Sequence, residues 1–247
     1  MDLGLTDRVY LVTGGSKGLG FATASALVAD GARVVVSSRS PDNVSSAVDT
    51  LGENAMGIAG DNADPDLPDR LVDAALRRFG RLDGLLVSVG GPPTGGVLDT
   101  SVSAWEQAFE SVFLGTLRLI RRVSAELADG GAIALVLSTS VREPLDNLAI
   151  SNGVRPGLAM VAKTLANEVG PRGIRVVSLL PGAFWTARGA AVYGDPAVVE
   201  RRTAGIPLRR IGDPDEFGRV AAFVLSPAAS YLTGTTVTID GGGVRGL

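Results

Sequence analysis

A glycine-rich loop between an expected strand and an expected helix constrains the fold of this chain more than any other feature. The segment LVTGGSKGLGFA (residues 11–22) links the apolar run RVYLVT to the helical pattern LGFATASALVADG. Gly14, Gly18 and Gly20 permit a tight turn whose backbone approaches a diphosphate, and the helix behind them offers free N–H groups. A second expected strand ends near Ser38, which completes the context that a dinucleotide-binding loop requires. A purely structural turn is the alternative.

Short β-rich runs alternate with longer helical patterns along the whole chain. Several of these runs are almost continuously apolar, which is typical of strands covered on both faces. Alternation at this spacing predicts an α/β fold in which helices cover both faces of a parallel sheet. We expect one Rossmann-type domain over residues 1–247, with a lid-like segment at about 184–213. The seven expected strands begin at Arg8, Arg33, Ala55, Leu82, Ala132, Ile174 and Thr236.

The residues that the chain lacks narrow its chemistry. It contains no Cys and no His, which excludes disulfides, argues against a zinc site and removes the commonest general base. A net charge of −3 argues against nucleic-acid binding. There is no signal-peptide pattern, and no apolar run approaches the roughly 18 residues that span a bilayer. We therefore expect a cytoplasmic protein that uses no metal and acts on a small molecule.

The end of the second expected strand indicates which nucleotide would bind. An NAD site usually places an acidic residue there to hold the ribose 2′-hydroxyl. This chain has SSRS (residues 37–40) at that point, with Arg39 and no acid, and Lys17 adds a second cation from the loop. Arginine can pair with a 2′-phosphate, so the sequence favours NADP(H) over NAD(H). A solvated surface arginine is the alternative.

With these motifs the chain resembles the classical short-chain dehydrogenase/reductase family over nearly its whole length. Residues 13–20, TGGSKGLG, resemble the family's TGxxxGxG loop, and Asp61-Asn62 stands where the family keeps an acid near the adenine. Residues 88–91, SVGG, replace its usual Asn-Asn-Ala-Gly. The C-terminal residues 206–242 are most similar to members called 3-oxoacyl-[acyl-carrier-protein] reductases.

The resemblance implies a cofactor site and an oligomer. Family members are commonly tetramers or dimers joined through two long helices, here about 101–128 and 148–169, and through the last strand. A homotetramer or dimer is therefore expected. The implied cofactor-binding residues are Gly14, Ser16, Lys17, Gly18, Leu19, Gly20, Ser38, Arg39, Asp61, Asn62, Ser88, Gly90, Arg155, Pro181, Gly182 and Thr186.

The catalytic positions that the resemblance implies are altered. The family uses a Ser, a Tyr, a Lys and usually an Asn, and the tyrosine gives a proton to the substrate oxygen as hydride arrives. Ser138 stands at the serine position. In AISNGVRPGLAMVAKTLANE (residues 149–168) the tyrosine position holds Ser151 and the lysine position holds Arg155, while the asparagine position falls on Val112.

These exchanges are expected to weaken proton donation without abolishing hydride transfer. An alkyl hydroxyl is a poorer acid than a phenol, and a positioned general acid contributes about 10²–10⁴-fold to the rate. Arg155 stays charged and can still hold a ribose hydroxyl or a carboxylate. A water held by Ser138 and Ser151 is the simplest substitute donor. Tyr193 in the lid-like segment is another candidate, with a packing or surface role as the favoured alternative. Ser140, Arg142 and Glu143 can line the substrate mouth, although Glu143 precedes a proline and the sequence favours a solvated turn carboxylate there.

Two interpretations of function follow from this combination. The first is an NADP(H)-dependent oxidoreductase that reduces the carbonyl of an apolar small molecule, with Ser138, Ser151 and Arg155 at its catalytic centre. The second is a catalytically weak or inactive NADP(H)-binding protein with a regulatory or partner role. Lyase or isomerase chemistry is a third. The apolar substrate is inferred from the lid residues Phe184, Trp185, Tyr193, Val198, Val199 and Ile206.

Overall fold

The protein is a single Rossmann-type domain built on one seven-stranded parallel sheet in the order β3-β2-β1-β4-β5-β6-β7. The computed structural model describes residues 2–187, 189 and 195–246. The expected fold class is confirmed. The strands are β1 (Val9–Thr13), β2 (Arg33–Ser38), β3 (Ala55–Ala59), β4 (Gly84–Ser88), β5 (Ala132–Val136), β6 (Arg175–Pro181) and β7 (Thr235–Ile239).

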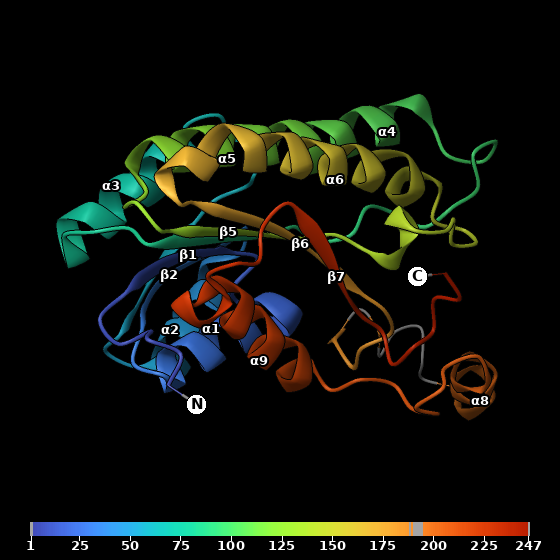
Figure 1. Ribbon diagram of the computed structural model, residues 1–247. Coiled ribbons are helices and arrows are strands. Elements are labelled where there is room, and N and C mark those ends of the chain that lie inside the picture. Colours follow the sequence, from blue (N-terminus) through green and yellow to red (C-terminus); the bar gives the residue numbers. More distant parts are fainter. Residues whose placement is uncertain (1, 188, 190–194, 247) are drawn as a thin grey trace.

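Helices cover both faces of the sheet (Figure 1). One layer contains α1 (Gly18–Ala29), α2 (Pro41–Leu51) and α9 (Pro214–Leu225). The other contains α3 (Leu67–Phe79), α4 (Val102–Ala108), α5 (Gly115–Glu126) and α6 (Ala149–Val169). The short helix α8 (Pro196–Ala204) stands apart at one end of the sheet.

Alternation along the strands divides the core into two apolar layers. In β1, Val9 and Leu11 pack with the layer of α3, α5 and α6, while Tyr10 and Val12 pack with α1 and α9. All five residues of β1 are buried. Because successive side chains of a strand point to opposite faces, a central strand with helices on both sides needs this continuous apolar run.

The helical pattern that starts at residue 102 is interrupted. The sequence predicts one long helix there, but a π-helical segment (Phe109–Leu114) separates α4 from α5. At its end, Gly115 lies against the backbone of Asn62, where an added Cβ would sit 2.2 Å from the Asn62 carbonyl oxygen. Periodicity misses the interruption because apolar residues recur at helical spacing through it. A π-helical turn of this kind often occurs at a functional site.

The lid-like segment is only partly described. Phe184 pairs with Gly212 in an isolated bridge, and Ala183, Ile206 and Ile211 form a small buried cluster. Residues 188 and 190–194, which include Tyr193, lie outside the described part of the chain.

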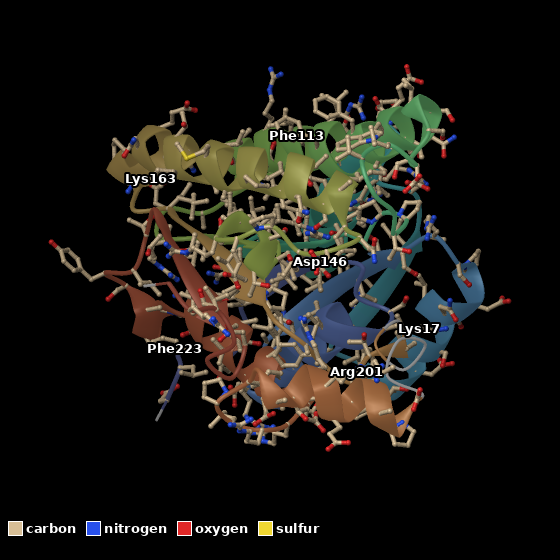
Figure 2. All side chains as sticks on the ribbon, turned by 90° about the vertical axis from the view of Figure 1, so that its right-hand side faces the viewer. Lys17, Phe113, Asp146, Lys163, Arg201 and Phe223 are labelled. Carbon is tan, nitrogen blue, oxygen red and sulfur yellow. The ribbon has the colours of Figure 1, made fainter. Side chains whose placement is uncertain are left out.

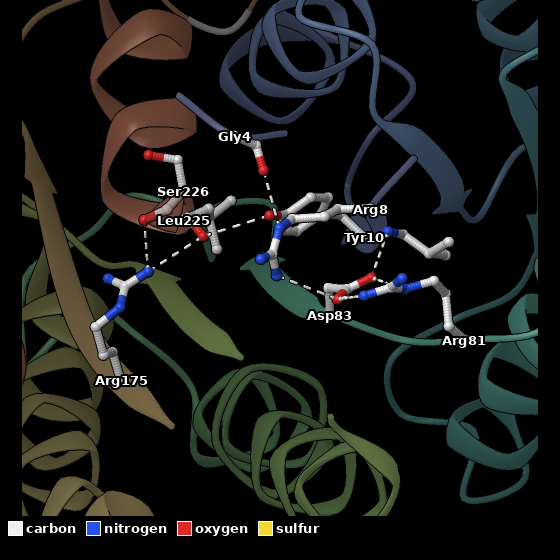
Figure 3. Close-up of polar contacts among 9 residues, drawn as sticks. Gly4, Arg8, Tyr10, Arg81, Asp83, Arg175, Leu225 and Ser226 are labelled. Atoms are coloured by element: carbon white, nitrogen blue, oxygen red, sulfur yellow. Dashed lines mark hydrogen bonds and ion pairs between the residues drawn. The ribbon is translucent and has the colours of Figure 1, made fainter. Parts of the chain in front are cut away.

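A polar network closes the amino ends of the strands (Figure 3). Asp83, directly before β4, accepts two hydrogen bonds from Arg81 at 2.8 and 2.6 Å, one from Arg8 at 3.3 Å, and one from the backbone N–H of Val9 at 2.9 Å. The Asp83 side chain is 1% exposed. Its charge is therefore compensated by two guanidinium groups and a backbone donor, as a buried carboxylate requires.

Arg175, at the same edge of the sheet, binds the C-terminus of α9. It opens β6, is buried, and donates to the carbonyl oxygens of Val224, Leu225 and Ser226 at 2.6, 3.2 and 2.8 Å. These carbonyls stand at the C-terminus of α9, where a helix leaves acceptors without intrahelical partners. Burial lowers the pKa of Arg175. This buried cation therefore ties the end of α9 to the sheet.

Candidate active site

The glycine loop forms a cradle that only residues without a Cβ can build. Gly14 and Gly18 have φ angles of +59° and +55°, in the left-handed region. A Cβ on Gly20 would lie 2.3 Å from the carbonyl oxygen of Gly14. The loop is also fixed to β2, because the N–H of Gly15 donates to the carbonyl of Ser37 at 3.0 Å.

The start of α1 lies directly behind this cradle. Lys17 precedes the helix in an extended conformation, and its side chain makes no capping hydrogen bond to the first turn. An uncapped helix N-terminus supplies N–H groups and a favourable dipole to an anion. The cradle and the helix end therefore fit the diphosphate of a dinucleotide. Figure 2 looks onto this edge of the sheet, with Lys17 at the start of α1 and Arg201 of α8 on the same side of the molecule.

The candidate residues for the adenosine half gather at the end of β2. The Ser16 hydroxyl donates to that of Ser38 at 2.8 Å, which joins the loop to this strand. Lys17 and Arg39 are both exposed. Within residues 2–187, 189 and 195–246, neither side chain takes part in an ion pair. One exposed cation therefore precedes α1 and another directly follows β2, and no carboxylate in the described part of the chain forms an ion pair with either.

Further candidates follow the carboxyl ends of neighbouring strands. A Cβ on Gly14 would meet the Ser88 carbonyl oxygen at 2.2 Å, and one on Gly18 would meet the Thr186 methyl at 3.3 Å. Ser88 and Gly14 thus adjoin between β4 and β1, where the strand order reverses and where α/β proteins bind ligands.

The remaining candidates are placed around the same edge but are less directly linked to the loop. Asp61 accepts from the N–H of Ala63 at 3.0 Å, and Gly90 is exposed after β4. Gly182 lies against Asp240, where an added Cβ would sit 2.6 Å from the Asp240 Cβ. Leu19, Asn62 and Pro181 are half-buried.

The catalytic candidates meet between the end of β5 and the first turns of α6. Arg155 Nε donates to the Ser151 hydroxyl at 3.2 Å, and Arg155 Nη1 donates to the carbonyl of Val136 at 2.9 Å. The two residues are 7% and 5% exposed. Ser138 accepts the N–H of Ser140 at 3.0 Å and begins the 3-10 turn Thr139–Val141. The structure therefore brings Ser151 and Arg155 into direct contact and places Ser138 two residues from a further serine.

Sequence reasoning placed Ser140 only at the substrate mouth, but the structure gives it a closer role. Its hydroxyl lies 3.3 Å from that of Ser151, and the residue is 4% exposed. Arg142 instead turns outward and donates to Thr236 at 2.8 Å. The repeated serines of STS (residues 138–140) were the available signal.

Comparison with known proteins agrees with this geometry. A family model described as enoyl-(acyl carrier protein) reductase matches residues 14–243. Dehydrogenase/reductase SDR family member 4 of Bos taurus is 34% identical over 98% of this chain and 89% of its own length. The chain belongs to the short-chain dehydrogenase/reductase family, a family of oxidoreductases.

Solved structures of this family superpose closely on the chain. The L-sorbose reductase of Gluconobacter frateurii, complexed with NADPH and L-sorbose, has a TM-score of 0.94 at 28% identity and full coverage of both chains. The NADPH-dependent reductase YwfH, involved in bacilysin biosynthesis, has a TM-score of 0.91 at 25% identity, with 97% of this chain and 99% of that chain covered.

The position at which the family's asparagine is expected is apolar in this chain. Val112 is buried within the π-helical segment, and its carbonyl accepts from the Thr116 hydroxyl at 2.6 Å. A small cavity lies between Val112 and the end of β5, with about 10 Å³ of space for the centre of a water molecule. Among the described residues that line it, Arg155 alone is charged. The others include Val87, Val112, Thr116, Leu135 and Leu158.

The two tyrosines in the described part of the chain do not restore the missing phenol. Tyr10 is buried at the amino end of the sheet, where desolvation raises its pKa, and Tyr231 is exposed just before β7. In the described part of the chain, therefore, no phenol lies beside Ser151. Tyr193, the other candidate donor, falls outside that part.

The described residues contain no group of three or more Asp, Glu, His or Cys side chains arranged to hold a metal ion. None of the helices placed by the structure has both the length and the apolar character needed to cross a bilayer.

Proposed function

We propose that the chain is an NADP(H)-dependent oxidoreductase that reduces the carbonyl of an apolar small molecule. The observation that carries this proposal is the pairing of a complete diphosphate cradle with a buried Ser151–Arg155 contact at the same edge of the sheet. A binding protein needs the cradle, whereas a buried cation beside hydroxyl groups is what a developing negative charge on oxygen requires.

The preference for NADP(H) is supported by charge at the end of β2. Lys17 and Arg39 are exposed there, and Arg39 occupies the place where an NAD site usually has an acid. The relatives crystallised as NADPH complexes or described as NADPH-dependent are consistent with the same choice.

Each catalytic residue has one proposed role. The nicotinamide supplies the hydride when the cofactor is bound. Ser138 orients the substrate carbonyl, and Ser151 donates a hydrogen bond to its oxygen. Arg155 polarises Ser151 through their 3.2 Å contact and places positive charge near the oxygen. Water supplies the proton to the product, because a serine hydroxyl is too weak an acid to replace a phenol efficiently.

An apolar substrate is supported by exposed apolar side chains in the segments that follow the carboxyl ends of β4 and β6. Val97 and Leu98, in the loop after β4, are exposed, as are Trp185 and Leu208 of the lid-like segment. Exposed apolar side chains at the edge of a sheet where ligands bind favour binding of apolar ligand surface.

The test is a fluorescence titration of the purified protein with NADPH and, separately, with NADH. We expect NADPH to bind more tightly, and Arg39→Ala to weaken NADPH binding by about 10- to 100-fold while leaving NADH binding nearly unchanged. Arg77→Ala on the exposed surface of α3 is the matched control, and it should change neither. Equal affinity for both nucleotides would overturn the assignment of Arg39.

A panel of activated carbonyl compounds then tests turnover. NADPH oxidation that depends on the carbonyl supports the oxidoreductase proposal. Tight NADPH binding without turnover on any of them would favour the inactive nucleotide-binding alternative, and no binding of either nucleotide would refute both.

We also propose a homo-oligomer that joins through the outer helices. Phe109 is partly exposed and stacks on Phe113 with ring centroids 4.8 Å apart, and Met160 is exposed on α6. Light scattering coupled to size-exclusion chromatography tests this, with Met160→Glu expected to shift the protein toward a smaller species. A monomeric wild-type protein would contradict the proposal.

A further inference from the structure

Three serines and one arginine are connected in series at the end of β5. Arg155 can only donate, so the direction of its bond to the Ser151 hydroxyl is fixed. Ser151 in turn lies 3.3 Å from Ser140, and Ser140 donates its backbone N–H to Ser138. The Ser151 and Ser140 hydroxyls therefore form one hydrogen-bonded chain that begins at a buried cation, and the Ser138 hydroxyl is joined to it through the backbone N–H of Ser140.

The hydroxyl protons of these serines determine how many hydrogen bonds the site can donate to a ligand. The contact between the Ser140 and Ser151 hydroxyls uses one proton, whichever of the two is the donor. Two hydroxyl groups carry two protons, so the pair keeps a second one for a further acceptor. Ser138 accepts at its oxygen and retains its own proton as well. The site can thus direct two O–H donors at one oxygen.

The geometry points to Ser140 as an additional binding residue for the substrate oxygen, acting with Ser151 and Ser138 as an oxyanion site backed by Arg155. This inference rests on the proposed function and names the part of the site that replaces the missing phenol. During hydride addition the carbonyl carbon gains the hydride, and the oxygen takes the electron pair of the C=O π bond. Water then protonates that oxygen and leaves hydroxide, so the serines need not ionise.

The burial of this hydrogen-bonded chain strengthens each of its hydrogen bonds. Ser140, Ser151 and Arg155 are all less than 8% exposed, and a hydrogen bond to a charged oxygen is stronger in such a dry site than in water. The same arrangement favours substrates whose oxygen readily accepts negative charge, such as conjugated or adjacent dicarbonyl compounds. It disfavours simple ketones, which depend more on a general acid.

Binding of 4-nitrophenol in the presence of NADP⁺ tests the oxyanion site without requiring turnover. The absorbance of the phenolate reports its ionisation directly. We expect the wild-type protein to bind the phenolate more tightly than the neutral phenol. Ser140→Ala should reduce phenolate affinity by about tenfold, because one hydrogen bond to a charged oxygen is lost or rearranged. Ser140→Thr keeps a hydroxyl and should restore most of that affinity.

A double-mutant cycle separates a shared role from two independent ones. Because Ser140 and Ser151 share one outward proton, the hydroxyl that remains in either single alanine variant can still donate, so the double alanine variant should lose more than the product of the two single losses. Ser124→Ala is the control, since its buried hydroxyl has no hydrogen-bond partner within the described residues. NADPH affinity should be unchanged in every variant, which shows that the fold is intact.

The outcomes distinguish this inference from the proposed function. Equal binding of phenol and phenolate by the wild type, or a Ser140→Ala variant with unchanged phenolate affinity, would overturn the role of Ser140. Additive losses in the double variant would refute the shared proton. If the phenolate results hold while no carbonyl is reduced, the oxyanion site stands and the reductase proposal fails.

Discussion

Replacement of Arg175 by Met removes the cation that ties α9 to the sheet. The variant loses hydrogen bonds to three carbonyl oxygens, and the shortest of these is the 2.6 Å bond to Val224. Ser226 keeps a second partner, the N–H of Ala229 at 3.1 Å, and Leu225 keeps the long 3.5 Å contact from the Tyr10 hydroxyl. One carbonyl is therefore left without a donor and two are weakened.

The magnitude follows from these three contacts. A hydrogen bond from a charged group contributes about 1.5–3 kcal/mol, and an unsatisfied buried carbonyl costs about 1–3 kcal/mol. The variant recovers part of this because the guanidinium no longer has to be desolvated, the effect that lowers the pKa of Arg175. We expect a net loss of about 3 kcal/mol in the free energy of unfolding, from these contributions taken together. For a domain of this size that corresponds to roughly 6–12 °C in Tm.

Urea unfolding followed by circular dichroism at fixed protein concentration measures this loss. Arg175→Lys retains one charged donor and should fall between the wild type and the Met variant. Arg77→Met, at an exposed i,i+4 pair with Asp73, should change stability by less than about 0.5 kcal/mol. An Arg175→Met variant within about 1 kcal/mol of the wild type would refute the reasoning, because desolvation would then cancel the hydrogen bonds.

Three further predictions concern the site and its surroundings. Ser151→Tyr combined with Arg155→Lys introduces a phenol beside an ammonium group, so carbonyl turnover should acquire a dependence on pH that the wild type lacks; identical pH–rate profiles would contradict this. Gly20→Ala forces a Cβ to within 2.3 Å of a loop carbonyl and should weaken NADPH binding at least about tenfold, whereas unchanged affinity would show that the loop can shift. The hydrogen bond from Arg210 lowers the pKa of Glu216 from 4.5 to about 2, so its contribution to stability is present above pH 4.5 and is lost as the pH falls toward 2. The stability difference between wild type and Glu216→Gln should therefore shrink over that interval in urea titrations, and a constant difference would argue against this assignment.

The sheet and the nucleotide cradle are predictable because their signals are local. Each strand is a short apolar run, and the glycines of residues 14–20 must be adjacent in sequence to build the turn. The start expected for every strand lies within two residues of its observed position. The substitutions at residues 151 and 155 are visible for the same reason, since the two stand one helical turn apart.

Contacts between distant residues are not predictable from those signals. Ser140 reaches Ser151 only because the 3-10 turn after β5 folds against the start of α6. In the sequence Arg175 is simply the first residue of a strand, and nothing near it indicates that it binds the end of a helix about 50 positions later. The π-helical segment has no apolar signature of its own. Each of these features depends on packing between elements, which residue periodicity does not record.

The networks that stabilise the fold and the proposed catalytic residues lie at opposite ends of the strands. The Asp83 and Arg175 networks close the amino ends of the strands, and the serine–arginine chain lies at the carboxyl ends. Substitutions that are far apart and share no partners have additive effects on stability. A lineage with this architecture can therefore exchange its reactive side chains without weakening the Asp83 and Arg175 networks. A library randomised at residues 138, 140, 151 and 155 should accordingly yield mostly folded proteins with divergent activities.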